Sequence, residues 1–237
     1  SFRAPMGVDV LGSRVFVADG DDVAIFGTDM TYVGLQTSLT DWLGWACGIE
    51  AKPGFFEQPS LYVADLGRHR IQRRFLAEEG SNVVTAEIMG REGPHWGAYG
   101  RANGQLRSPC AIASAPDGSA IYVLDRDNHR VQRFTVDGSY SGKWGQQGGG
   151  PGQFRRPEGI AVGPDGNVFV ADTDNHRIQC ISPDGEFIFQ FGGRGGVGDE
   201  MKFREPRGLT FDASGKLYVC DSGNGVLVLA DTFGATP

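Results

Sequence analysis

The chain has 237 residues, of which 40% are hydrophobic, and its formal net charge is −7. No apolar run approaches the roughly 18 residues of a membrane-spanning helix, and the negative charge disfavours non-specific binding to phosphate backbones or acidic membranes. The 37 glycines are spread along the chain, which is typical of the many turns of an all-β fold. The first residues, SFRAPMGVDV, begin directly on repeat material, so we expect part of a longer polypeptide or a processed product.

One short phrase recurs five times in chain order. Its copies occupy residues 17–26, 63–72, 123–132, 170–179 and 219–228, and each contains one aspartate at the same place: Asp19, Asp65, Asp125, Asp172 and Asp221. Steps of 46, 60, 47 and 49 residues separate these aspartates. A repeat of this length with strand-like content predicts the blades of a β-propeller. We therefore expect an all-β propeller of four-stranded antiparallel blades, with either a ring of five or part of a six-bladed ring.

The repeat runs from end to end, so residues 1–237 are expected to form a single propeller domain. The expected blades are residues 3–36, 45–90, 106–145, 154–192 and 203–234, with irregular links at 36–45 and 77–105. The fourth repeat is the clearest: strands are predicted at 154–162, 168–171, 177–181 and 186–191, separated by turns rich in Pro, Asp and Gly. The fifth repeat ends without a convincing fourth strand.

Several phrases of the repeat resemble a known family. They are DNHRVQ at 127–132, DNHRIQ at 174–179, a variant at 67–72, a Pro-x-Gly opening before the first strand, and glycine-rich links that end in Phe or Leu. These features resemble the NHL-repeat β-propellers. The first and fifth repeats keep the aspartate and the apolar strands but lack the His-Arg pair. The resemblance implies a closed ring, commonly of six blades, and many members of this family serve as interaction platforms.

The histidine of the phrase recurs in three successive blades and is always followed by arginine. A catalytic group is needed once, whereas a group that packs blade against blade is needed in every blade. We therefore interpret the aspartate and the His-Arg pair as structural, satisfying one another and the backbone of the turns. The residues of this motif are Asp65, His69, Arg70, Asp125, His129, Arg130, Asp172, His176 and Arg177.

The links between blades are predicted to share one face of the propeller with the turns that join second and third strands. Most of the variable material lies in these links, and loops on a rigid scaffold are where function concentrates. Exposed Trp, Tyr and Arg are common anchors of interfaces, so we expect partner binding by Trp42, Trp45, Arg91, His95, Trp96, Tyr99 and Arg101. The alternative is that these aromatic residues only pack their own loops.

The residue after each opening proline begins the innermost strand, so five equivalent residues are expected to line a central channel. They are Met6, Cys47, Cys110, Glu158 and Arg207. The resemblance includes lyases that hold zinc through histidines at this kind of position, and no histidine occupies any of the five. We expect no metal and no cofactor. The four cysteines, which include Cys180 and Cys220, have no metal-type spacing and are interpreted as small core residues.

Three functions compete. The leading prediction is a non-enzymatic recognition or assembly scaffold that binds a protein partner through loops on one face. The second is an RNA-binding NHL propeller, which the acidic composition disfavours, although several arginines could lie on one face: Arg68, Arg91, Arg101, Arg107, Arg155, Arg156 and Arg207. The third is a propeller lyase or hydrolase resembling the peptide-amidating lyases, for which no catalytic constellation stands out.

Overall fold

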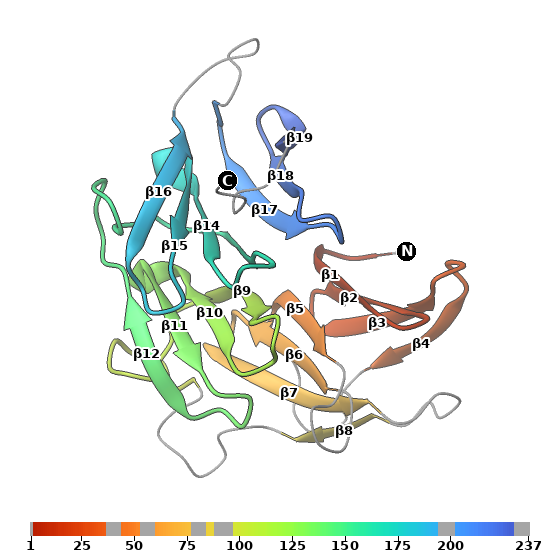
Figure 1. Cartoon of the computed structure of the whole chain (residues 1–237). Helices are drawn as coiled ribbons and strands as arrows, with labels where there is room; N and C mark the ends of the chain where they lie inside the picture. Colours follow the sequence, from red (N-terminus) through yellow and green to blue (C-terminus); the bar gives the residue numbers. More distant parts are fainter. Residues whose placement is uncertain are drawn as a thin grey trace. The chain divides into compact units, whose positions relative to one another are not determined.

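A computed structural model describes residues 2–36, 44–52, 60–76, 84–87, 97–193 and 202–229 (Figure 1). The chain divides into two compact units, one formed by residues 1–112 and 134–140, the other by 113–133 and 141–237. Within the described ranges the secondary structure is β, apart from two short 3-10 turns. In these ranges no helix is long and apolar enough to cross a membrane.

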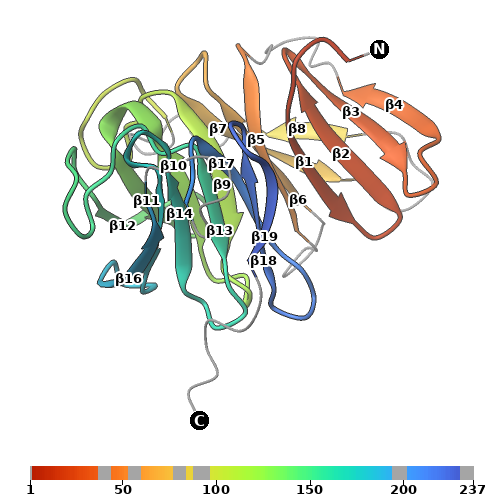
Figure 2. The same cartoon turned by 90° about the horizontal axis from the view of Figure 1, so that it is seen from above.

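The first unit contains two four-stranded antiparallel sheets in which the strands follow chain order. Sheet one consists of β1 (Pro5–Leu11), β2 (Arg14–Asp19), β3 (Asp22–Gly27) and β4 (Tyr32–Gln36). Sheet two consists of β5 (Ala46–Lys52), β6 (Ser60–Asp65), β7 (Arg70–Leu76) and β8 (Val84–Glu87). Figures 1 and 2 both show β1 beside β5, so the first strands of the two sheets are neighbours.

The third sheet has the order β12-β11-β10-β9, and its residues are divided between the units. It consists of β9 (Pro109–Ser114), β10 (Ile121–Asp125), β11 (Arg130–Phe134) and β12 (Tyr140–Trp144). Sheet four, in the second unit, consists of β13 (Gly159–Val162), β14 (Val168–Asp172), β15 (Arg177–Ile181) and β16 (Phe187–Gly192). Sheet five shows three strands in the described residues: β17 (Pro206–Phe211), β18 (Leu217–Asp221) and β19 (Gly225–Leu229).

These strands agree closely with the prediction for the fourth repeat. Strand β15 occupies the predicted residues, β14 extends one residue further to Asp172, and β16 is shifted by one residue. The first strand is shorter than predicted because residues 154–158 form the opening segment and only 159–162 pair with β14. Strand β8 lies inside the segment 77–105 that was predicted as an irregular link, so a strand occupies part of that link.

Alternating apolar residues build the core between neighbouring sheets. In the first unit one cluster joins β2 and β3 of sheet one to β5 and β6 of sheet two, and Phe16, Leu61 and Val63 in it are fully buried. In the second unit a corresponding cluster includes Phe169, Phe203 and residues of β18. Each strand contributes every second residue to such a cluster, which is the period-2 pattern of a sheet face packed against another sheet.

The Pro-x-Gly opening has a steric reason. A Cβ on Gly159 would lie 1.8 Å from the backbone oxygen of Arg207 in β17, and a Cβ on Gly48 would lie 2.7 Å from the Cα of Ala111 in β9. No real side chain fits at these separations, so glycine allows the innermost strands of successive sheets to approach closely. At Gly48 and Gly159 the glycine of this opening is therefore a packing requirement of the innermost strands.

Candidate functional site

The recurring aspartate at the end of each second strand binds the backbone segment that opens its own repeat. Asp19 accepts hydrogen bonds from the amides of Arg3 and Ala4, at 2.9 and 2.5 Å. The same contact recurs in the later repeats, from Gly44 to Asp65 (2.8 Å), from Arg155 to Asp172 (2.7 Å) and from Glu205 to Asp221 (2.7 Å). This carboxylate is buried in each case, so the aspartate fixes the start of its blade by satisfying amides that would otherwise be unpaired.

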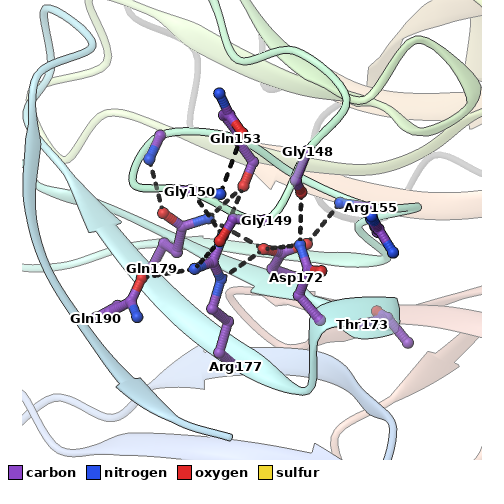
Figure 3. Close-up of polar contacts among 12 residues, drawn as sticks. Gly148, Gly149, Gly150, Gln153, Arg155, Asp172, Thr173, Arg177, Gln179 and Gln190 are labelled. Atoms are coloured by element: carbon purple, nitrogen blue, oxygen red, sulfur yellow. Dashed lines mark hydrogen bonds and ion pairs between the residues drawn. The ribbon is translucent and has the colours of Figure 1, made fainter.

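In the fourth repeat the buried carboxylate is the centre of a larger network (Figure 3). The Nε of Arg177 donates to Asp172 over 2.8 Å, and the amides of Asn175 and Gln179 donate to the same oxygen over 2.8 and 3.0 Å. The side chain of Asp172 is fully buried and that of Arg177 is 8% exposed. A buried ion pair is tolerated only when its remaining hydrogen-bonding groups are satisfied, and this network satisfies them.

The other groups of the same side chains hold the glycine-rich link that precedes the blade. Figure 3 shows Arg177 reaching from β15 to this link, where its two terminal nitrogens donate to the carbonyl oxygens of Gly149, Gly150 and Gln153 at 2.8–2.9 Å. Asn175 donates to the carbonyl of Gly148 over 2.8 Å. The link therefore lies beside the turn between the second and third strands, as the sequence predicted for this face.

The histidine of the motif binds the repeat that follows its own. Nδ1 of His69 accepts the backbone N–H of Ser108 over 2.9 Å, and Nδ1 of His129 accepts that of Arg156 over 3.0 Å. Nδ1 of His176 instead faces the carbonyl oxygen of Arg204, to which it must donate. The three histidines have positive φ, between 55° and 57°. The two residues of the His-Arg pair therefore have different roles: the arginine pairs with the aspartate of its own repeat, whereas the histidine binds the opening segment of the next repeat.

Burial lowers the pKa of His129, and the charge of Arg156 lowers it further. The carboxylates of Asp127, Asp174 and Asp172 act in the opposite direction. Because Nδ1 is an acceptor, a proton on this nitrogen would break the contact with Arg156. The junction after the third repeat therefore requires a neutral histidine.

Two links have the same backbone but different side chains. In residues 97–108 the amide of Gly100 donates to Leu106 O (3.2 Å) and that of Leu106 to Ala98 O (3.0 Å). The corresponding bonds of residues 145–156, forty-eight positions later, are 3.1 and 2.9 Å long. In each link the side-chain oxygen of a glutamine, Gln105 or Gln153, also accepts a backbone amide over 3.1 Å. This glutamine is the fourth residue before the next opening proline, and a bulky apolar residue follows it. Tyr99 and Arg101 thus occupy the positions of Gln147 and Gly149.

The link 97–108 exposes the aromatic side chain of Tyr99 beside the turn that contains the motif histidine His69. Tyr99 is 63% exposed, and its ring centroid lies 4.9 Å from that of His69. The guanidinium carbon of Arg107 lies 5.3 Å from the same ring, within the range of a cation–π contact. Arg101 is also exposed, two residues after the tyrosine. The loop therefore presents an aromatic ring between cationic groups.

The turn after β6 extends this surface. The carboxylate of Asp65 accepts the backbone amides of Trp45 and Arg68, over 3.3 and 3.1 Å. Trp45 is 44% exposed, and Arg68 is exposed where the third and fourth repeats have asparagine. We call the group Trp45, Arg68, His69, Tyr99, Arg101 and Arg107 the arginine–aromatic surface.

Only part of the predicted partner-binding set can be placed. Trp45, Tyr99 and Arg101 lie on the exposed surface just described. Trp42, Arg91, His95 and Trp96 lie outside the described residues. Sequence reasoning named Arg68 and Arg107 only in the RNA-binding alternative, as arginines that could share one face, and not in the partner-binding set. A residue-by-residue comparison of repeats two and four would have shown Arg68, because it replaces the asparagine of the DNHR phrase.

The five residues predicted to line a channel occupy similar places but differ in surroundings. Met6, Cys47 and Arg207 each lie where the register of the first strand pair shifts by a residue. Met6 is exposed, whereas Cys47 and Cys110 are buried. Glu158 and Arg207 form an ion pair, and Arg207 also contacts Glu205 over 3.2 Å. That these residues surround a channel remains a prediction.

The cysteines and acidic residues define no further centre in the part of the chain that the structure describes. There, no group of three or more His, Cys, Asp or Glu side chains is arranged to hold a metal ion. Cys180 is buried, which raises the pKa of its thiol to about 12. Cys220 is an exposed free thiol on β18. The expectation of four core cysteines is therefore wrong for Cys220, because alternation along β18 points it to the face opposite the cluster with sheet four.

Comparison with known proteins is consistent with this architecture. Residues 154–181 and 203–231 match the NHL repeat family, which confirms the resemblance noted in the sequence. No curated protein matches the chain. Among solved structures, a catalytically inactive virginiamycin B lyase from Staphylococcus aureus with quinupristin is 15% identical, with a TM-score of 0.63; the match covers 94% of this chain and 69% of that one.

Two further solved structures have comparable similarity. A gluconolactonase from Xanthomonas campestris is 15% identical with a TM-score of 0.61, and the match covers 90% of this chain and 67% of that one. A chain of a nidogen/laminin complex, for which no organism is named, is 21% identical with a TM-score of 0.59, over 90% and 71% of the two chains. These similarities establish the fold of propeller-type proteins with NHL repeats.

Proposed function

We propose that this protein is a recognition or assembly module that binds a protein partner through the arginine–aromatic surface. The observation that carries the proposal is the pair of equivalent links. The same loop backbone forms in repeat four with Gln147 and Gly149, so neither Tyr99 nor Arg101 is needed to build it. A tyrosine that is 63% exposed and is not needed for folding is best explained by contact with another molecule.

The rigidity of the surface supports the same function. Buried Asp65 holds the backbone of Trp45 and Arg68, and His69 holds the following opening segment while its ring lies against Tyr99. A backbone that is fixed in advance loses less conformational entropy on binding, which favours affinity. The nidogen/laminin complex is by its name an assembly of proteins, so propeller folds of this kind occur in protein complexes.

A photo-crosslinking amino acid at position 99 tests this function in an extract of the source organism. We expect one protein to be crosslinked reproducibly, and the crosslink to disappear when Trp45 is replaced by serine. The matched control carries the same group at Asp137, in a turn at the other end of the strands. Crosslinking of the same protein from both positions, or of none from position 99, would contradict the proposal.

We also propose that the sheets are blades of a closed ring, of five blades or of six with a further sheet. The face of sheet one that carries Val8 and Val10 supports this, because these side chains are 65% and 51% exposed on an otherwise folded sheet. A closed ring would cover them with a neighbouring blade. Replacing Val8 by aspartate should then lower the melting temperature of the full-length protein markedly, and an unchanged melting temperature would contradict ring closure.

A further inference from the structure

Several residues of the arginine–aromatic surface differ from those at the equivalent places of repeat four and of the link that precedes it. At the positions where the two links share a backbone, tyrosine replaces Gln147 and arginine replaces Gly149. In the turn after the second strand, Arg68 replaces the asparagine that repeat four uses to hold its link, and Gly67 replaces the exposed Asp174. At these positions the surface therefore gains a tyrosine and two arginines and lacks one acid, whereas Ser108 stands where the other link has Arg156.

The surface has a local charge that is opposite to the charge of the chain. The described stretches 66–69 and 97–108 contain three arginines and no aspartate or glutamate, although the whole chain has a net charge of −7. The nearest acid of the motif, Asp65, is buried and pairs with Arg70 over 3.2 Å. A local excess of arginine on an acidic protein selects acidic partners and steers their approach.

We infer that the arginine–aromatic surface binds an acidic peptide segment, with carboxylates paired to arginine and an apolar or aromatic residue against Tyr99 or Trp45. This inference rests on the proposed function and names the chemistry of its partner. Arginine suits this role because its planar guanidinium pairs bidentately with carboxylates. A long polyanion such as RNA is less favoured, because an overall negative charge repels it beyond the small cationic surface.

The test uses the full-length protein and two labelled probes, an octaglutamate peptide and an eight-nucleotide oligouridylate, followed by fluorescence anisotropy. We expect octaglutamate to bind more tightly than oligouridylate, and raising salt from about 50 to about 300 mM to weaken this binding because the surface pairs are screened. Tighter binding of oligouridylate would overturn the inference in favour of nucleic acid.

Two exchanges between the links make the test specific. The double variant Tyr99→Gln and Arg101→Gly installs the repeat-four residues and should weaken octaglutamate binding about tenfold, since each exposed charge or aromatic contact contributes roughly threefold to fivefold. The matched control Lys143→Gln removes one exposed cation from β12 and should leave binding unchanged. Equal loss in both variants would show that only net charge matters and would overturn the inference.

The reverse exchange, Gln147→Tyr with Gly149→Arg, should create a second, weaker site in repeat four. Space exists there, because a Cβ on Gly149 would meet nothing closer than 3.8 Å. A failure of octaglutamate binding together with specific crosslinking at position 99 would refute the acidic chemistry but keep the partner-binding function. Octaglutamate binding without any crosslinked protein would support the acidic chemistry of the surface but contradict the proposed partner-binding function.

Discussion

Repeats two and four share a buried aspartate that binds the opening segment and pairs with an arginine, but they differ in the side chains that this arrangement leaves exposed. In repeat four, Asp172, Arg177 and Asn175 bind a link made largely of glycine, and most of the polar groups of these side chains point inward. In repeat two, Asp65 binds the backbone of residues whose side chains are exposed, among them Trp45 and Arg68. The comparison teaches that the recurring motif supports the blade, whereas departures from it mark the surface that is available for binding.

The largest expected effect is a loss of stability on replacing the buried aspartates, and this loss should be greater for Asp172 than for Asp65. Asp172→Ala leaves Arg177 buried without its counter-charge and should lower the free energy of unfolding by about 4 kcal/mol. Asp65→Ala should cost about 3 kcal/mol, because Arg70 is more exposed and its ion pair is longer, 3.2 against 2.8 Å. Urea unfolding measures both, and Asp174→Ala, at an exposed carboxylate, is the control. A larger loss for Asp65→Ala would reverse the comparison.

Stability should be nearly as sensitive to an added methyl group where the innermost strands of neighbouring sheets approach closely. Gly159→Ala places a Cβ 1.8 Å from a backbone oxygen and should cost about 3 kcal/mol, because backbone cannot move aside cheaply. Gly208→Ala at the same motif position should cost less than about 1 kcal/mol, because its Cβ would meet only the Cβ of Cys220, at 3.3 Å. Thermal unfolding of the two variants tests this, and equal losses would show that the glycines serve another purpose.

The link 97–108, which precedes repeat three, contains two bridged residues that should respond differently to substitution. Leu106 is fully buried and pairs with exposed Tyr99. Leu106→Ala should lower the free energy of unfolding by about 3 kcal/mol through loss of core packing, whereas Tyr99→Ala should change it by less than about 0.5 kcal/mol. A strongly destabilised Tyr99→Ala variant would mean that the ring supports its own loop, which is the alternative that the sequence left open.

The smallest expected effect depends on pH. Because the pKa of folded His129 is lowered, mainly by burial, the unfolded chain binds the proton more readily. Stability from this junction is therefore fully present above the unfolded pKa of about 6.5 and decreases as the pH falls through that value toward the folded pKa. Urea unfolding at about pH 7.5 and 5.5 should show a loss in the native protein that is reduced in His129→Asn. The same loss in the variant would assign the pH dependence to other groups.

Much of the fold followed from the sequence because its signals are local. The spacing of Asp125 and Asp172, the turns around Asp165 and Asp184, and the alternation of apolar residues set the second, third and fourth strands of repeat four within about one residue. The first strand of repeat four was predicted too long, because Phe154 and Pro157 are apolar like the strand that follows, yet residues 154–158 lie outside the pairing of β13 with β14. Sequence pattern alone does not distinguish an opening segment from a strand.

The candidate site was predictable only in part. Exposed Trp45 and Tyr99 were expected because aromatic residues stand out in variable links. Arg68 and Arg107 were missing from the partner-binding set, because their part in this surface depends on Asp65 fixing the backbone of Arg68 and on the Tyr99 ring lying beside Arg107. The separate tasks of His129 and Arg130 were also hidden, because adjacent residues in a phrase can point to different repeats.

The sequence by itself determined the repeat, the order of the strands in each sheet and the place of the buried aspartates, since each depends on residues that are close along the chain. Tertiary structure alone decided which links share one backbone, which side chains that backbone leaves exposed, and why Gly48 and Gly159 cannot carry a side chain. The limit at these glycines depends on contacts between residues roughly fifty to sixty positions apart, where neighbouring repeats meet and where separation along the chain carries no information on distance.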